Sequence, residues 1–129
     1  MEKDLFHEFE TGMLAESGEQ VDLGLCPWNE HKDFAGVSLK TIVTTAQTAD
    51  LFTCHLVRIK PNHKIGMHTH PNSIEVHEVI KGSGTCLTEK GEVHYAPGVM
   101  TIIPRDEQHE VSAGEEGLCL FAKFITVSA

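Results

Sequence analysis

The chain has 129 residues and a formal net charge of −9, a length that allows one domain with its own apolar core and no need of disulfides. Its ten lysine and arginine residues are scattered, which argues against binding to nucleic acid or to an anionic membrane surface. No apolar run approaches the roughly 20 residues that cross a bilayer, so a membrane-spanning protein is not expected.

The first part of the chain, residues 1–35, has the least regular pattern, and we expect an arm that leads into the remainder. The stretch Met1–Leu5 is acidic and lacks an apolar core segment, so no signal peptide is expected. Apolar residues at helical spacing predict one short amphipathic helix or turn, formed by Leu5, Phe6, Phe9, Met13 and Leu14.

Residues 36–129 alternate short runs rich in Val, Ile, Thr and Phe with turn residues, which predicts a single β domain. Glycine-containing turns are expected at Gly82–Gly84 and Ala113–Gly117, among others. Turns every eight to twelve residues favour an antiparallel sandwich or barrel. The predicted strands are Val37–Thr45, Leu51–Lys60, Ile65–His70, Glu75–Lys81, Thr85–Thr88, Glu92–Tyr95, Val99–Ile103, His109–Ser112 and Leu118–Val127.

The four cysteines, Cys26, Cys54, Cys86 and Cys119, form no Cys-x-x-Cys pair, so a structural zinc site is not expected. Reduced and mostly buried thiols, together with the lack of a signal sequence, are typical of a cytoplasmic protein. We therefore predict a cytoplasmic location.

Three histidines and one glutamate are the most informative residues of the chain. Side chains alternate between the two faces of an extended strand, so His68 and His70 point the same way. Glu75 lies an odd number of positions further on, but the turn residues Pro71–Ser73 break the strand and allow Glu75 to face both histidines. Together with His109, these side chains suit a borderline divalent metal ion. Burying such a cluster without a cation would be costly.

The first group of residues resembles a signature motif of the cupin superfamily, which runs Gly-x5-His-x-His-x(3,4)-Glu-x6-Gly. His68, His70 and Glu75 occupy its ligand positions, and Gly82 closes the pattern after six residues. Asn62 stands in place of the opening glycine. Asparagine tolerates a positive φ well, so this departure is compatible with the same turn.

The second cupin motif runs Gly-x5-Pro-x-Gly-x2-His-x3-Asn, and Gly98, Pro104 and His109 match it in register. Asp106 replaces the second glycine and Ala113 replaces the asparagine. Neither position is a metal ligand in the family, so the resemblance still implies an intact site.

The resemblance covers roughly residues 36–127 and implies an all-β fold, an antiparallel double-stranded β-helix or jelly-roll barrel. It also implies one divalent transition-metal ion, which would be Fe, Mn, Ni, Co, Cu or Zn. The ligands it implies are His68, His70, Glu75 and His109.

His77 lies two residues beyond Glu75 and is expected to face the same cavity. It would orient a ligand, carry protons, bind as a fifth ligand, or simply be a core ring bonded to the backbone; we take it as the candidate catalytic residue. Glu78 is a rival acid, but strand alternation places it on the other face. Arg58 and Lys123 lie in apolar strands, where one of them could clamp a substrate carboxylate, although a snorkelling or interface charge is the simpler interpretation.

The resemblance implies a metal-dependent enzyme that acts on a small polar or anionic molecule, with dioxygenase, isomerase or lyase chemistry. The alternative is a non-catalytic cupin that binds or senses a small molecule, although no helix-turn-helix pattern or basic segment suggests a DNA-bound sensor. A third alternative, a structural barrel, is less expected because all four ligands are present. Small cupins commonly pair, so we expect a homodimer in which the first 25 residues cover or exchange with the partner's sheet edge.

Overall fold

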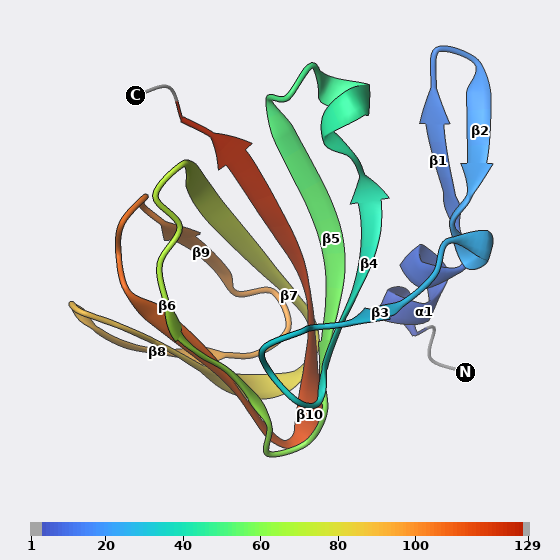
Figure 1. Cartoon of the computed structure of the whole chain (residues 1–129). Helices are drawn as coiled ribbons and strands as arrows, with labels where there is room; N and C mark the ends of the chain where they lie inside the picture. Colours follow the sequence, from blue (N-terminus) through green and yellow to red (C-terminus); the bar gives the residue numbers. More distant parts are fainter. Residues whose placement is uncertain (1–3, 128–129) are drawn as a thin grey trace.

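Two long, bent strands organise the molecule, because each of them contributes to both of the sheets that enclose the interior (Figure 1). The computed structural model describes residues 4–127. Its elements are α1 (Leu5–Glu10), β1 (Met13–Glu16), β2 (Glu19–Asp22), the 3-10 turn η1 (Leu23–Leu25), β3 (Asn29–Glu30), β4 (Val37–Val43), η2 (Thr45–Thr48), β5 (Phe52–Ile59), β6 (Lys64–His68), β7 (Ser73–Thr88), β8 (Gly91–Tyr95), β9 (Met100–Ile103) and β10 (His109–Thr126).

The sheets are antiparallel throughout. The first half of β7 and the second half of β10 pair with each other, flanked by β9 on one side and by β5, β4 and β3 on the other. The second half of β7 and the first half of β10 also pair, and β8 and β6 flank them. This arrangement is the predicted all-β, antiparallel jelly-roll barrel, and that prediction is confirmed.

The predicted turns at Gly82–Gly84 and Ala113–Gly117 are wrong, because both segments lie inside single continuous strands. The two strands bend together there, and their register shifts between Ala113 and Leu118. Gly82 has a φ of +85°, and a Cβ at this position would collide with the carbonyl oxygen of Gly117. The glycines therefore allow two bent, paired strands to approach each other closely, and they do not end the strands.

Side-chain alternation decides which residues face the interior. Val79, Leu118 and Leu120 are buried on the inner face of the paired strands β7 and β10, and Val57 and Ile59 of β5 complete the same layer. The neighbouring positions point outward and are mostly half-buried or exposed. The apolar interior thus forms from the period-2 pattern of the strands.

The two motif positions where this chain lacks glycine adopt the left-handed backbone conformation. Asn62 has a φ of +61° and Asp106 a φ of +68°. Asparagine and aspartate are the residues that tolerate this conformation best after glycine, so both turns keep their shape. The compatibility expected for Asn62 is confirmed.

The N-terminal segment begins with the predicted short helix, α1, whose first turn is capped by the Asp4 carboxylate accepting from the backbone N–H of His7. Met13 and Leu14 lie outside this helix in β1, which pairs with β2 through a tight turn at Ser17 and Gly18. The hairpin was not predicted, although a Ser-Gly pair is a turn signal. In Figure 1 the hairpin stands beside the barrel, beyond β4.

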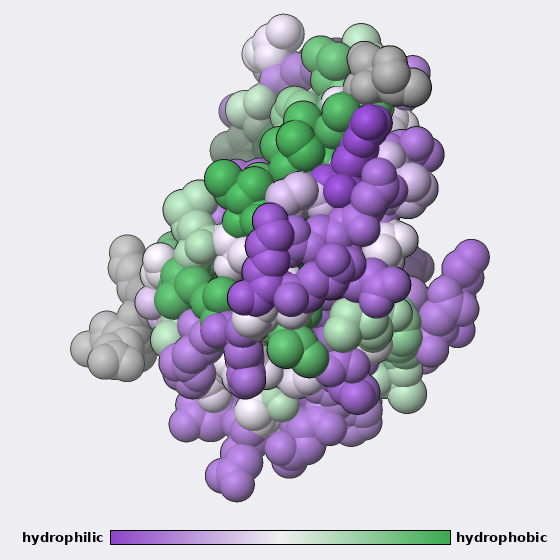
Figure 2. Space-filling model, turned by 90° about the vertical axis from the view of Figure 1, so that its left-hand side faces the viewer, coloured by the Kyte–Doolittle hydropathy of each residue, from purple (hydrophilic) through white to green (hydrophobic). Residues whose placement is uncertain are grey.

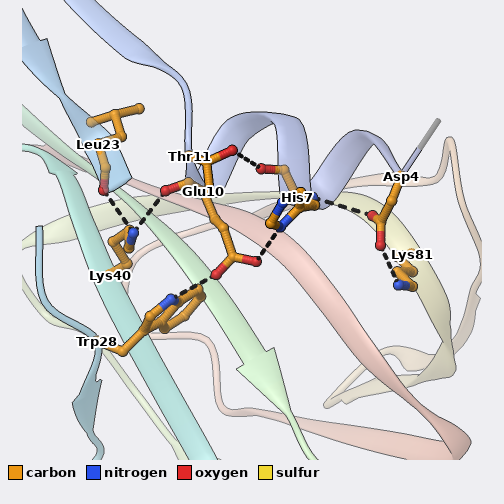
Figure 3. Close-up of polar contacts among 8 residues, drawn as sticks. All are labelled: Asp4, His7, Glu10, Thr11, Leu23, Trp28, Lys40 and Lys81. Atoms are coloured by element: carbon orange, nitrogen blue, oxygen red, sulfur yellow. Dashed lines mark hydrogen bonds and ion pairs between the residues drawn. The ribbon is translucent and has the colours of Figure 1, made fainter. Parts of the chain in front are cut away.

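A small set of polar contacts attaches the N-terminal segment to the outer face of the barrel (Figure 3). The Lys40 ammonium on β4 is 3% exposed and donates to the carbonyl oxygens of Glu10 and Leu23, each at 2.7 Å. The indole N–H of Trp28 donates to the Glu10 carboxylate at 2.9 Å. The aromatic ring of Phe9 packs edge-on against Phe121 of β10.

The division into an arm of residues 1–35 and a barrel of residues 36–129 stays a prediction. Residues 1–3 and 128–129 of these two ranges lie outside the described part of the chain. Among the residues that the structure describes, no helix has both the length and the apolar character needed to traverse a bilayer.

Candidate metal centre

Three short segments bring the four candidate ligands to one point inside the barrel. His68 ends β6, His70 follows it, Glu75 lies near the start of β7, and His109 begins β10 directly opposite His68. One possible donor atom from each of the four lies within 4.8 Å of all the others. The tight turn at Pro71–Asn72 separates the histidine pair from β7, as the strand parity required.

Backbone contacts orient two of the imidazoles. Nδ1 of His68 lies 2.7 Å from the carbonyl oxygen of Gly66, and Nδ1 of His109 lies 3.0 Å from that of Glu107. A carbonyl oxygen only accepts, so Nδ1 carries the proton in both rings and Nε2 is left available to a metal ion. Burial lowers the pKa of His68, which favours the neutral form that metal binding needs.

Two buried atoms at the centre of the cluster face each other without a satisfied hydrogen bond: Oε1 of Glu75 and Nε2 of His109. They lie 2.9 Å apart, and Nε2 of His70 lies 3.5 Å from the same carboxylate oxygen. Burial lowers the pKa of His109, but the contact with Glu75 outweighs it and the net shift is upward. A cation bound by these atoms would neutralise the Glu75 carboxylate and give both atoms a partner. The donor set therefore fits a metal ion.

His77 holds the other oxygen of the same carboxylate. Its Nε2 lies 2.6 Å from Oε2 of Glu75, and its Nδ1 lies 2.8 Å from the phenol oxygen of Tyr95. The Glu75 carboxylate accepts from Nε2 of His77, which leaves Nδ1 of the neutral ring to accept from the phenol. Burial raises the pKa of Tyr95, so the phenol keeps the proton that this bond needs. Burial also raises the pKa of Glu75, but its contacts with His109 and His77 prevail and keep the pKa well below its ordinary value.

The hydrogen-bonded chain of Tyr95, His77 and Glu75 gives the two oxygens of the Glu75 carboxylate different partners. Oε2 is occupied by His77, while Oε1 points at the histidine cluster. The arrangement favours a carboxylate that offers one oxygen to a metal ion. Tyr95 was given no role in the sequence interpretation, because it is 18 residues from His77 and lies on β8, which pairs with the other half of β7.

A cavity of about 80 Å³ lies beside these side chains. The residues that line it are His31, Leu39, Val57, Ile65, His68, His70, Glu75, His77, Val111, Leu120, Ala122 and Phe124. His31, which precedes β4, was assigned no role from the sequence and carries no motif that would have indicated one. The Phe34 ring lies near both His31 and His68, with centroid distances of 4.9 Å and 6.1 Å.

The two cationic side chains considered as substrate clamps do not line the cavity. The guanidinium of Arg58 lies over the ring of Trp28, 4.2 Å from its centroid. Lys123 forms an ion pair with Glu78 on the outer face of the sheet. The simpler interpretation of both charges agrees with these contacts, and Glu78 points away from the candidate centre as strand parity predicts.

Comparison with known proteins identifies one matching family and several similar structures. A family model described as a cupin domain matches residues 55–124. No curated protein matches the sequence significantly. The crystal structure of a predicted oxalate decarboxylase from Thermotoga maritima superposes with a TM-score of 0.74 and 15% identity, over 81% of this chain and 96% of the other.

Two further structures resemble this chain at similar levels. The polyketide cyclase RemF from Streptomyces resistomycificus has a TM-score of 0.73 and 20% identity, over 85% of this chain and 80% of its own. KdgF from a Halomonas species has a TM-score of 0.67 and 16% identity, over 79% and 89%. At these identities the likeness concerns the fold.

Proposed function

The chain belongs to the cupin family, and from that premise we propose that it is a metal-dependent enzyme that acts on a small molecule. In this proposal His68, His70, Glu75 and His109 hold one divalent transition-metal ion. The observation that carries the proposal is the pair of buried atoms Oε1 of Glu75 and Nε2 of His109, which face each other at 2.9 Å and have no satisfied hydrogen bond. When bound, such an ion supplies Lewis acidity, and iron also supplies redox chemistry.

The residues around the site have separable tasks. The backbone carbonyls beside His68 and His109 set the tautomers that leave Nε2 free. The acid–base role of His77 stays a prediction. Both nitrogens of its ring are already engaged, so we propose that it acts first as a positioning residue that holds Glu75. Apolar side chains line most of the remainder of the cavity.

Metal content and turnover test the proposal together. The protein, purified without a tag, is expected to contain about one divalent ion per chain by elemental analysis. His109→Ala should lose it, whereas His94→Ala, an exposed histidine on β8, should keep it. After iron loading, oxygen uptake on a panel of diketones, thiols and flavonoids that disappears in His109→Ala would support an oxygenase.

The same assays separate the proposal from its alternative. Metal binding without oxygen uptake, but with consumption of a hydroxy-acid or sugar, would point to isomerase or lyase chemistry. Metal binding with ligand capture and no turnover would favour a binding or sensing cupin. A chain that takes up no metal would contradict the centre itself. The metal's identity, among Fe, Mn, Ni, Co, Cu and Zn, follows from the elemental analysis.

We also propose that the chain forms a homodimer through the outer face of β9 and its neighbours. Met100 and Ile102 on β9 are 65% and 71% exposed, and Phe52 and Ile125 add to the same outer face. Figure 2, which views the side where β6, β8 and β9 lie, shows a band of hydrophobic side chains. Exposed apolar groups that gather in this way mark interaction surfaces.

Sedimentation tests the dimer. A mass of twice 14.2 kDa is expected, and Ile102→Lys should lower it to one chain. Leu87→Lys, which alters an exposed residue of the other sheet, should leave it unchanged. A single-chain mass for the unaltered protein would contradict the proposal. The cytoplasmic location predicted from the sequence stays a prediction.

A further inference from the structure

The wall of the cavity beside the metal centre is apolar. Its apolar lining residues are Leu39, Val57, Ile65, Leu120 and Phe124, and the Phe124 ring lies edge-on against His70, 5.0 Å between centroids. The free volume is about 80 Å³. One water molecule needs roughly 10–15 Å³ by this measure, so the cavity accepts a ligand of about five to eight heavy atoms.

No lysine or arginine lines this cavity in the described part of the chain. Arg58 and Lys123, the nearest candidates in the sequence, are engaged with Trp28 and Glu78 on the outer face. The polar group that remains at the wall beyond the cluster is His31. Its Nδ1 accepts the backbone N–H of Asp33 at 3.1 Å, so its Nε2 carries the proton and offers a ligand one hydrogen bond.

The charge of the occupied centre limits what this wall can accept. A divalent ion held by one carboxylate and three neutral imidazoles has a net charge of +1, so one negative charge on the ligand balances it. A second negative charge would lie against leucine, valine and phenylalanine with no cation to pair with. Burial of an unpaired charge is strongly unfavourable.

We infer, on the basis of the metal centre proposed above, that the site selects small monoanionic oxygen chelates with an apolar body and rejects dianions of the same size. The class includes enolised 1,3-diketones and short 2-oxo or 2-hydroxy monocarboxylates. Two oxygens bind the ion, and the alkyl remainder packs against the side chains of Leu39, Leu120 and Phe124. Oxalate, malonate and sugar phosphates fall outside it.

A pair of isosteric ligands tests this selectivity. Pentane-2,4-dione and malonate have the same number of heavy atoms and form the same six-membered chelate ring, but malonate has charged oxygens where the diketone has methyl groups. Each is titrated into the Co(II)-loaded protein, and binding is followed by the visible absorption of the ion. Each ligand's affinity for the protein is divided by the same ligand's affinity for aqueous Co(II). The resulting ratio should be about 100-fold or more larger for the diketone than for malonate.

A substitution in the wall of the cavity provides the matched comparison. Leu39 is half-buried, so Leu39→Arg can place a cation beside the ligand, and it should reduce the preference by at least about tenfold. Leu39→Met keeps the wall apolar at similar volume and should preserve the preference.

Two results would overturn the inference, and they differ from each other. Malonate that binds the Co(II)-loaded, unaltered protein as tightly as the diketone would refute the selectivity and leave the metal centre standing. Failure of the protein to retain Co(II), measured by elemental analysis before any titration, would refute the centre and the inference with it.

Discussion

The hydrogen bond between His77 and Glu75 allows a quantitative prediction, because it holds the carboxylate from outside the ligand set. Glu75 is 4% exposed, and its Oε2 accepts from His77 at 2.6 Å. Once Oε1 binds a metal ion, this bond is the remaining side-chain contact of the carboxylate. His77→Phe keeps a ring of similar size and removes the donor, so Oε2 is left buried and unpaired.

The expected magnitude follows from the type of bond that is lost. A hydrogen bond to a charged group contributes about 1.5–3 kcal/mol, which corresponds to about 10–150-fold in an equilibrium constant. Loss of the groups that orient metal ligands generally costs about 10–100-fold in affinity. We therefore expect His77→Phe to weaken Co(II) binding by about 10–100-fold.

Competition with a chromogenic chelator measures this affinity, with circular dichroism as a check that the barrel is intact. Tyr95→Phe is the graded control: it keeps the imidazole and removes only the phenol that sets its tautomer, so its loss should stay within about tenfold. An affinity for His77→Phe within about twofold of the unaltered protein, with His109→Ala still abolishing binding, would refute the assignment of His77 as the residue that positions Glu75.

Other substitutions test the framework that carries the site. Lys40→Met leaves the carbonyl oxygens of Glu10 and Leu23 without their donor. It should lower the free energy of unfolding by about 2 kcal/mol in urea titrations and speed proteolysis before residue 29. Unchanged cleavage would contradict the role of Lys40 in attaching the N-terminal segment. Gly82→Ala combines a φ of +85° with a backbone collision, so it should lower the free energy of unfolding by at least about 3 kcal/mol in thermal unfolding. Gly98→Ala, with a φ of +94° and open space around its Cβ, should lower it by only about 1–2 kcal/mol. Equal losses for the two variants would argue against the close approach of β7 and β10 at Gly82. Burial raises the pKa of the Cys54 thiol to about 11, so the unfolded chain loses this proton at a lower pH than the folded one and stability should fall above about pH 9, by about 2 kcal/mol near pH 10.5. Denaturant titrations of Cys54→Ala should show a shallower decline over this range, and parallel pH profiles would contradict the buried thiol.

Three candidate ligands, His68, His70 and Glu75, were accessible from local rules of strand and turn, whereas His109 was found through its place in the second motif. Strand alternation relates His68 to His70, and the turn at Pro71–Asn72 resets the parity for Glu75. The partners that hold those ligands were not accessible. Tyr95 reaches His77 only because β8 and the first half of β7 lie in facing sheets, and no spacing in the sequence encodes that contact.

The predicted turn at Gly82–Gly84 failed for a related reason. Glycine ends a strand in one context and allows the close approach of a neighbouring strand in another, and the local sequence is the same in both. The decision came from the long ladder between β7 and β10, which continues through the bend. The direction of Arg58 was likewise settled by Trp28, which the N-terminal segment lays on the outer face of the barrel.

By itself the amino-acid order determined the antiparallel β class and the positive-φ turn at Asn62, because both depend on neighbours a few positions away. It also indicated the four candidate ligands, through two motifs that lie far apart in the chain. The tertiary structure decided the uncharged cavity wall, the split duties of the Glu75 oxygens and the exposed face of β9. These features arise where strands that are distant in the sequence meet. The free energy of packing selects which strands meet, and local backbone preferences do not.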